Sequence, residues 1–126
     1  MRTHHILLAA LLAASAGLAH AGDAAKGAVV FKRCLACHTA TEARNKVGPN
    51  LVGLIDRPVA SVEGFRYSKA MKAYSTGKTW TEADLATFLA GPRDLVMGTS
   101  MAFYGFRNPE DIADVIAYLK DPAAAQ

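Results

Sequence analysis

The sequence predicts an all-α fold in which long loops connect a few helices. Apolar residues recur at helical spacing in segments 85–89 and 112–119. Thr81 and Asn108 precede these segments and are residue types that cap the start of a helix. No segment alternates apolar and polar residues in the way that a half-buried strand does. Long loops are uncommon in a plain helical bundle, so a large prosthetic group is expected to fill the middle of the fold.

The expected helices are separated by turn and loop segments. The first begins after Asp23 and runs from about residue 24 into residues 34–38, and a short second helix covers 67–74. The third lies between Thr81 and the breaker Gly91-Pro92, and the last lies between Asn108 and Asp121-Pro122. Segments 39–66 and 93–107 are expected to be loops and turns, and residues 123–126 a frayed end. Gly27 costs a helix about 1 kcal/mol relative to Ala, so we expect another helix to approach closely there.

The sharpest chemical signal is the C-x-x-C-H motif Cys34-Leu35-Ala36-Cys37-His38. Thiols three residues apart on a helical turn lie on one side, where they can form thioethers with the two vinyl groups of a haem. The following imidazole can ligate the haem iron. A redox dithiol would need a βαβ context, and a zinc site would need further ligands. Because these are the only cysteines, and His38 is the only histidine after residue 20, the motif predicts covalent haem attachment.

Residues 1–21 are typical of a cleaved secretory signal peptide. A weakly basic start precedes a run of mostly Leu and Ala from Ile6 to Leu18, and Ala19-His20-Ala21 forms an A-x-A cleavage signal before Gly22. The alternative is a transmembrane anchor, which would need about 20 apolar residues, and this run is shorter. Residues 22–126 are therefore expected to form one exported, periplasmic domain without stable membrane insertion. Haem attachment of this type also takes place outside the cytoplasm.

The charge pattern argues against one class of partner. The chain has 14 Lys and Arg against 11 Asp and Glu, and loss of Arg2 with the signal peptide would leave a net charge of +2. There is no basic run and no interleaving of basic and aromatic residues, so nucleic-acid binding is not expected. Docking to other proteins would then depend on where the charges cluster rather than on the net charge.

Several further motifs occur in one order and at fitting spacing. They are Gly48-Pro49-Asn50-Leu51, Gly64-Phe65-x-Tyr67, Gly77-Lys78-Thr79-Trp80, Gly98-Thr99-Ser100-Met101-Ala102-Phe103 and Ile116-Ala117-Tyr118-Leu119. Together with the haem motif they resemble the soluble class I cytochromes c of bacteria, close relatives of the mitochondrial carrier. The resemblance covers essentially all of residues 22–126. It implies the class I cytochrome c fold, with helices and long loops around one haem c bound through Cys34 and Cys37.

The second axial ligand is expected to be a methionine. Electron carriers use His or Met in this position, and His38 is the only histidine of residues 22–126. Met71 lies on a helical stripe typical of a core residue, whereas Met97 and Met101 share a loop. The resemblance favours Met101, with Met97 as its rival, because the family usually has Pro at the place of Met97. Phe88 also departs from the mitochondrial protein, which has a Tyr near the methionine sulfur.

The resemblance implies roles for other residues around the haem. The carbonyl of Pro49 would accept the second N–H of His38 and so orient the ring. Arg57, Tyr67 and Trp80 would hydrogen-bond or neutralise a buried propionate, which needs donors and positive charge. The alternative for these three is an ordinary surface arginine and two core aromatic residues.

The expected function is one-electron transfer rather than enzyme catalysis. Iron held by His and Met has no open position for a substrate, and methionine ligation raises the reduction potential. The chain would be a monomeric carrier serving redox proteins such as a membrane cytochrome complex, a terminal oxidase or a dehydrogenase. One alternative is a permanent haem c subunit of a periplasmic dehydrogenase or other redox enzyme complex, and another is a sensor haem. The resemblance also places a basic rim at the haem edge, formed by Arg33, Lys46, Arg93 and Arg107.

Overall fold

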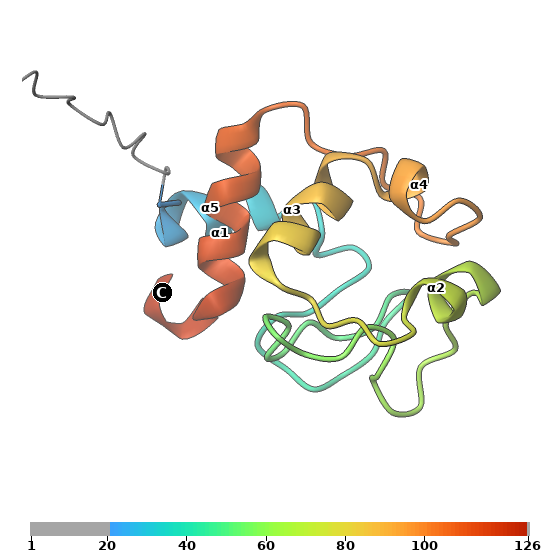
Figure 1. The fold of residues 1–126 in the computed structure, drawn as a ribbon. Helices are drawn as coiled ribbons and strands as arrows, with labels where there is room; N and C mark the ends of the chain where they lie inside the picture. Colours follow the sequence, from blue (N-terminus) through green and yellow to red (C-terminus); the bar gives the residue numbers. More distant parts are fainter. Residues whose placement is uncertain (1–20, 126) are drawn as a thin grey trace, which may run out of the picture.

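The computed structural model describes residues 21–125, so that the expected signal peptide lies outside the described residues except for Ala21 (Figure 1). In chain order the helices are α1 (Ala24–Phe31), α2 (Lys69–Tyr74), α3 (Glu82–Ala90), α4 (Pro92–Leu95), α5 (Pro109–Lys120) and the 3-10 helix η1 (Pro122–Ala125). Within residues 21–125 the β-structure amounts to one isolated antiparallel bridge between Pro58 and Thr79. The all-α prediction is confirmed.

Three helices begin at the caps that the sequence predicts. The side chains of Asp23, Thr81 and Asn108 each accept a backbone N–H from the first turn of the following helix, at 3.0, 3.1 and 3.0 Å respectively. A cap of this kind typically contributes about 1 kcal/mol, because it satisfies a donor that the helix itself leaves open. The starts of α1, α3 and α5 are therefore determined locally.

The first helix is shorter than predicted. α1 ends at Phe31, and residues 32–37 continue as tighter turns. In these turns the Cys34 N–H donates to the Phe31 carbonyl at 2.7 Å, and the Cys37 N–H donates to the Cys34 carbonyl at 3.1 Å. Bonds between residues three apart place such residues on the same side of the chain. The spacing of the two thiols thus suits the turns as well as it suits a helix.

The prediction of a loop over residues 93–107 was wrong at its start. α3 ends before Gly91, as predicted. Pro92 then begins a new helix, α4, at the first helical position, which proline favours. The Val96 N–H closes this single turn on the Pro92 carbonyl at 2.9 Å. The expected frayed end is likewise replaced by η1 over Pro122–Ala125, which is separated from α5 only by Asp121.

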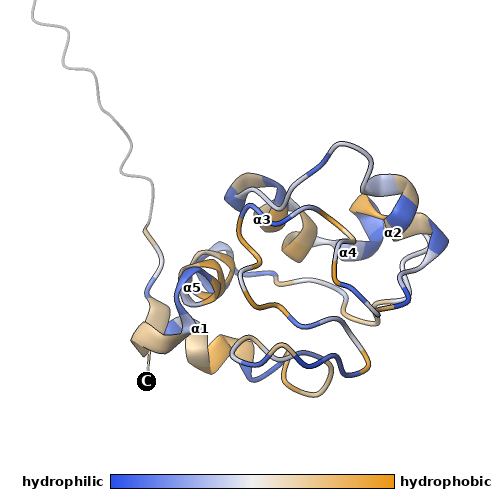
Figure 2. Cartoon of the chain, turned by 90° about the horizontal axis from the view of Figure 1, so that it is seen from below, coloured by the Kyte–Doolittle hydropathy of each residue, from blue (hydrophilic) through white to orange (hydrophobic). Residues whose placement is uncertain are grey.

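The terminal helices pack against each other on one side of the molecule, with α3 against α5 (Figures 1 and 2). A Cβ on Gly27 would overlap the Asp114 carbonyl oxygen and lie 2.8 Å from the Cβ of Tyr118. The Phe31 and Tyr118 rings meet nearby, with centroids 5.1 Å apart. The close helix approach expected at Gly27 is confirmed, and only a residue without a side chain permits it.

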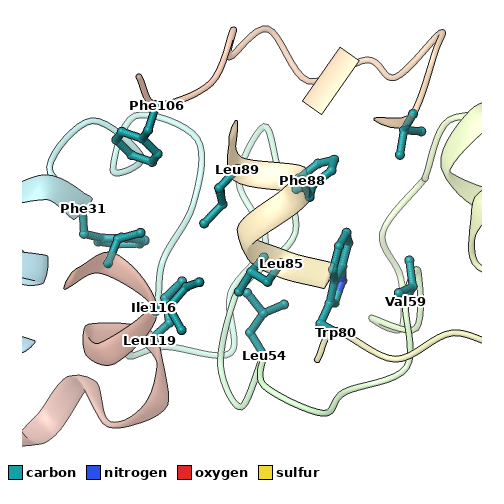
Figure 3. Packing of buried hydrophobic residues seen from close by; sticks show 13 residues of the cluster. Phe31, Leu54, Val59, Trp80, Leu85, Phe88, Leu89, Phe106, Ile116 and Leu119 are labelled. Carbon is teal, nitrogen blue, oxygen red and sulfur yellow. The ribbon is translucent and has the colours of Figure 1, made fainter. Parts of the chain in front are cut away.

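The core joins the helices to the loops. Figure 3 shows it extending from Phe31 and Ile116 of the terminal helices, past Leu54 and Leu85, to Trp80 and Val59. Leu54, Val59 and Trp80 belong to the segment between α1 and α3 that has little regular structure, yet all three are buried. Burial of apolar surface therefore holds these loops in place. The same loops form one side of the cleft described below.

Candidate haem site

An apolar cleft lies between the helices and the loops. Its lining contains every site residue predicted from the sequence: Cys34, Cys37, His38, Pro49, Arg57, Tyr67, Trp80 and Met101. Most of the remaining lining is apolar and includes Phe31, Leu51, Leu54, Leu85, Phe88, Leu89, Val115 and Leu119. Residues from both ends of the described chain thus meet around one space, whose lining is mostly apolar as that of a prosthetic-group site should be.

His38 is held at one nitrogen. Its Nδ1 lies 2.7 Å from the carbonyl oxygen of Pro49, so Nδ1 carries the proton and Nε2 keeps a free lone pair. Burial lowers the pKa of His38 below its ordinary value. The hydrogen bond with Pro49 opposes this by raising the pKa, whereas the positive charges of Lys46 and Arg57 lower it further. The imidazole is therefore neutral at neutral pH, which is the form that binds a metal.

Gly48 presses against the same ring. A Cβ at this position would overlap Cε1 of His38 and lie 2.8 Å from Nδ1 and 2.9 Å from Nε2. The Gly48 N–H also donates to the Cys37 carbonyl at 2.8 Å, which ties this loop to the haem motif. The sequence had indicated only a turn here, although a glycine directly before Pro49 was a signal for a close approach of the backbone.

The two cysteines are free and partly buried in the cleft wall. Burial raises the pKa of the Cys34 thiol to about 11, with a smaller opposing effect from Arg33 and a further small increase from Cys37. Cys34 is therefore held as a neutral thiol. Reactive redox dithiols have the opposite property, a lowered thiol pKa, so this environment disfavours that alternative.

Arg57 brings an unsatisfied donor to the cleft. Its Nη1 donates to the carbonyls of Asn50 at 3.1 Å and Val52 at 3.0 Å, which fixes the side chain across the loop. Its Nε is buried and has no hydrogen-bond partner in the part of the chain that the structure describes. Burial also lowers the pKa of the guanidinium. A buried cationic donor without a partner is costly, so the site suits an anionic group that enters the cleft.

Tyr67 and Trp80 lie in the same lining. The Tyr67 hydroxyl oxygen accepts the Val62 N–H at 3.0 Å, which leaves the phenolic proton to be donated elsewhere. Trp80 is buried, and its ring lies 4.9 Å from that of Phe88 by centroid distance. The backbone N–H of Trp80 donates to the Arg57 carbonyl at 2.9 Å, so the loop that carries Arg57 is paired with the segment that enters α3.

The three methionines of the described chain differ in whether they line the cleft. Met101 is half-buried and lines the cleft, and its backbone N–H donates to Thr99 Oγ1 at 3.3 Å. Met97 is 82% exposed and lies outside the lining. Met71, expected to be a core residue, packs against the core and also lines the cleft from α2. The remaining rival to Met101 is therefore Met71 rather than Met97.

These residues fit a covalently bound haem. The cleft offers thiols for two thioethers, a neutral imidazole, a thioether sulfur, apolar walls for the macrocycle and a guanidinium N–H for a carboxylate side arm. Fold and site together define a class I c-type cytochrome, an all-α electron-transfer protein rather than an enzyme.

Comparison with known proteins leads to the same class. The sequence matches the Cytochrome c family over residues 24–122. Cytochrome c2 of Blastochloris viridis is 45% identical over 111 residues, covering 87% of this chain and 86% of the relative. Cytochrome c of Stellaria longipes is 47% identical over 102 residues, covering 79% and 93%. Among solved structures, cytochrome cH from Methylobacterium extorquens aligns with a TM-score of 0.73 at 41% identity, covering 79% of this chain and 98% of that one.

The chain therefore belongs to the cytochrome c family. As a member of that family it carries one covalently attached haem c and transfers electrons. Among residues 21–125, no helix is long and apolar enough to cross a membrane.

Proposed function

We propose that this cytochrome is an exported, periplasmic one-electron carrier whose haem iron is ligated by His38 and Met101. The supporting observation is the convergence of both residues, with Cys34 and Cys37, on one apolar cleft in which Pro49 already engages Nδ1 of His38. The bound haem supplies a metal that changes charge by one unit. If His38 and Met101 both ligate the iron, no position would remain open for a substrate.

The proposal assigns each site residue a role in binding or tuning the haem. Cys34 and Cys37 would hold the haem covalently, and the Pro49 carbonyl fixes the proton of His38 on Nδ1, which would leave Nε2 free to ligate the iron. Arg57, Tyr67 and Trp80 stabilise a propionate, for which the buried Arg57 Nε is the clearest support. The apolar walls exclude water, and a low dielectric together with methionine ligation raises the reduction potential.

The proposed location rests on residues 1–21. The Leu- and Ala-rich run and the A-x-A signal support export and cleavage before Gly22, which would leave residues 22–126 as the mature domain. Intact mass of the purified native protein should equal that of a chain starting at Gly22 plus one haem. A mass that includes His20, or a haem that acid acetone extracts, would contradict the proposal.

The axial ligand can be tested by single substitutions. Met101→Ala should abolish the sulfur-to-iron absorption band of the oxidised protein and lower the reduction potential, because a thioether ligand favours the ferrous state. Met97→Ala is the matched control in the same loop, and Met71→Leu tests the other methionine of the cleft. Both should keep the band. Loss of the band in Met71→Leu but not in Met101→Ala would transfer the ligand to Met71.

A further inference from the structure

We propose that Asn45 is a positioning residue for the haem ligand His38 and acts through the peptide bond that joins Pro49 to Asn50. The Asn45 side chain fixes the orientation of this peptide and so keeps its carbonyl directed at the imidazole. The inference rests on the proposed ligation of the iron by His38. It concerns a residue that lies outside the lining of the cleft.

A single peptide unit carries both of the contacts that matter. Its carbonyl oxygen, from Pro49, accepts the Nδ1 proton of His38 at 2.7 Å. Its N–H, from Asn50, donates to the side-chain oxygen of Asn45 at 3.0 Å. Among the described residues no peptide bond is cis, so the two groups point in opposite directions from one rigid plane. Fixing the N–H therefore also fixes the direction of the carbonyl.

The Asn45 side-chain oxygen holds Asn50 by a second bond. It accepts a proton from the Asn50 side-chain Nδ2 at 3.1 Å, and the Asn50 side-chain oxygen in turn accepts the Val52 N–H at 3.3 Å. Asn50 is only 9% exposed, so water can replace a lost partner only poorly. A buried N–H without a partner is costly. The peptide therefore depends on an acceptor at position 45.

The backbone that leads to Asn45 is itself anchored beside the proposed ligand. Thr39 directly follows His38 and is 8% exposed. Its hydroxyl lies 2.7 Å from the Glu42 carbonyl oxygen and 3.2 Å from the Arg44 carbonyl oxygen, both of which can accept its proton. The residues just before Asn45 are thus tied to the residue just after the ligand, which places the Asn45 side chain on a fixed base.

This arrangement has a consequence for the iron as well as for the loop. Hydrogen bonds in series polarise one another, and Asn45, the peptide and His38 form such a series. A stronger hydrogen bond at Nδ1 makes the imidazole a more basic ligand. A more basic ligand favours the more highly charged ferric iron, so Asn45 lowers the reduction potential.

Asn45→Ala tests this role on the holoprotein. In NMR spectra of the reduced protein, the Nδ1 proton of His38 should exchange with solvent about tenfold faster, as for the loss of two ordinary hydrogen bonds. The reduction potential should rise. Entry of water alone would instead favour the ferric state and lower the potential. Unchanged exchange, or a lower potential, would therefore overturn the proposal.

Asn45→Asp is the conservative variant, because it keeps an oxygen acceptor for the Asn50 N–H. The His38 proton should then exchange as slowly as in the unsubstituted protein, and the potential should not rise, because the added negative charge also favours the ferric state. Exchange as fast as in Asn45→Ala would contradict the proposed role of the acceptor.

Asn108→Ala is the matched control. Asn108 is also an asparagine whose side-chain oxygen accepts a backbone N–H, that of Glu110 at 3.0 Å, and it too lies outside the lining of the cleft. This variant should lose stability but keep the exchange rate of the His38 proton and the potential. Equal effects of Asn108→Ala and Asn45→Ala would refute the proposal, since a general loosening of the fold would then explain both.

The unsubstituted holoprotein decides if Asn45→Ala cannot be obtained. When Asn45 releases the Asn50 N–H the carbonyl is freed as well, so this N–H and the His38 Nδ1 proton should be similarly protected from exchange. A far less protected Asn50 N–H would refute the proposal. Absence of a histidine from the iron refutes the proposed ligation, whereas a histidine-ligated iron that is insensitive to Asn45 refutes only this inference.

Discussion

The imidazole of His38 is oriented by two neighbours that act in different ways. Pro49 accepts its Nδ1 proton at 2.7 Å, and Gly48 packs on the ring so closely that a Cβ would overlap Cε1. The hydrogen bond with Pro49 sets the rotation of the ring, and the packing of Gly48 limits its tilt. The two residues are adjacent in the chain, which explains how a short turn can position the proposed ligand with little help from regular structure.

Gly48→Ala should therefore disturb the ligand directly. We expect a loss of about 2 kcal/mol in unfolding free energy from overpacking, with a shift in the spectrum of the ligated iron. Gly53→Ala is the control, because a Cβ there meets nothing within 4 Å and only its φ of 61° is strained. The control should lose stability with an unchanged spectrum. An unchanged spectrum in Gly48→Ala would show that the ring does not depend on this contact.

Arg57 combines a structural and an electrostatic role. Arg57→Gln removes hydrogen bonds to the Asn50 and Val52 carbonyls and should cost about 2 kcal/mol in unfolding free energy. It also removes a positive charge from the lining of the proposed haem site. The loss of this charge should favour the oxidised state and lower the reduction potential. Redox titration can compare it with Arg66→Gln, which removes the same charge from an exposed side chain outside the lining of the cleft. Equal potentials in the two variants would contradict a role for Arg57 at the haem.

At the scale of helices, the contact between α1 and α5 depends on one missing side chain. Gly27→Ala would gain about 1 kcal/mol in helix propensity but would force a Cβ onto the Asp114 carbonyl. We expect the steric cost to prevail and the denaturant midpoint to fall, with a net loss of about 2 kcal/mol. Val29→Ala, on the same helix at a side chain that is 62% exposed, should change stability little. A more stable Gly27→Ala would show that the helices can separate without cost.

Cation–aromatic contacts tie the loop of Met101 to two other segments. The Arg33 guanidinium, which follows α1, lies 4.9 Å from the Phe106 ring centroid and 5.3 Å from that of Phe103. Arg93 of α4 lies 4.6 Å from the ring centroid of Tyr104. Such contacts typically contribute about 0.5–1 kcal/mol at exposed sites. They also place two cations along the loop that carries the proposed ligand.

For the whole molecule, this arrangement supports a basic docking face. Arg33 and Arg93 are exposed, while Lys46 donates to the Leu35 carbonyl within the haem motif. Arg107 lies in the loop that leads from Met101 to α5. If these charges cluster at the haem edge, as the resemblance implies, they would steer an acidic redox partner and raise the association rate more than the affinity.

Electron transfer to the physiological partner should slow as ionic strength rises, because screening acts over about 8 Å at physiological salt. Arg33→Glu and Arg93→Glu should slow the reaction and weaken its salt dependence. Lys120→Glu, at the far end of α5 from α4 (Figure 1), should do neither. Stopped-flow rates over a salt series test this, and a flat response with unchanged rates in both arginine variants would indicate an apolar docking face.

The sequence alone determined the chemistry and the outline of the fold. The haem motif, the capping residues Asp23, Thr81 and Asn108 and the apolar stripes of α3 and α5 are local signals, since each depends on residues within one or two helical turns. They predicted the helix starts and covalent haem attachment. The resemblance then named site residues that all line one cleft, although their individual roles stay predictions.

Only the tertiary structure decided the features that depend on residues distant in the sequence. The exposure of Met97, the entry of Met71 into the cleft and the contact of Gly48 with His38 all result from how the loops fold onto the helices. Likewise, the convergence of Gly22, Asp23 and Gly27 on Asp114 joins the two ends of the described chain. Local sequence patterns carry no information on such contacts, because burial and close packing are properties of the assembled core.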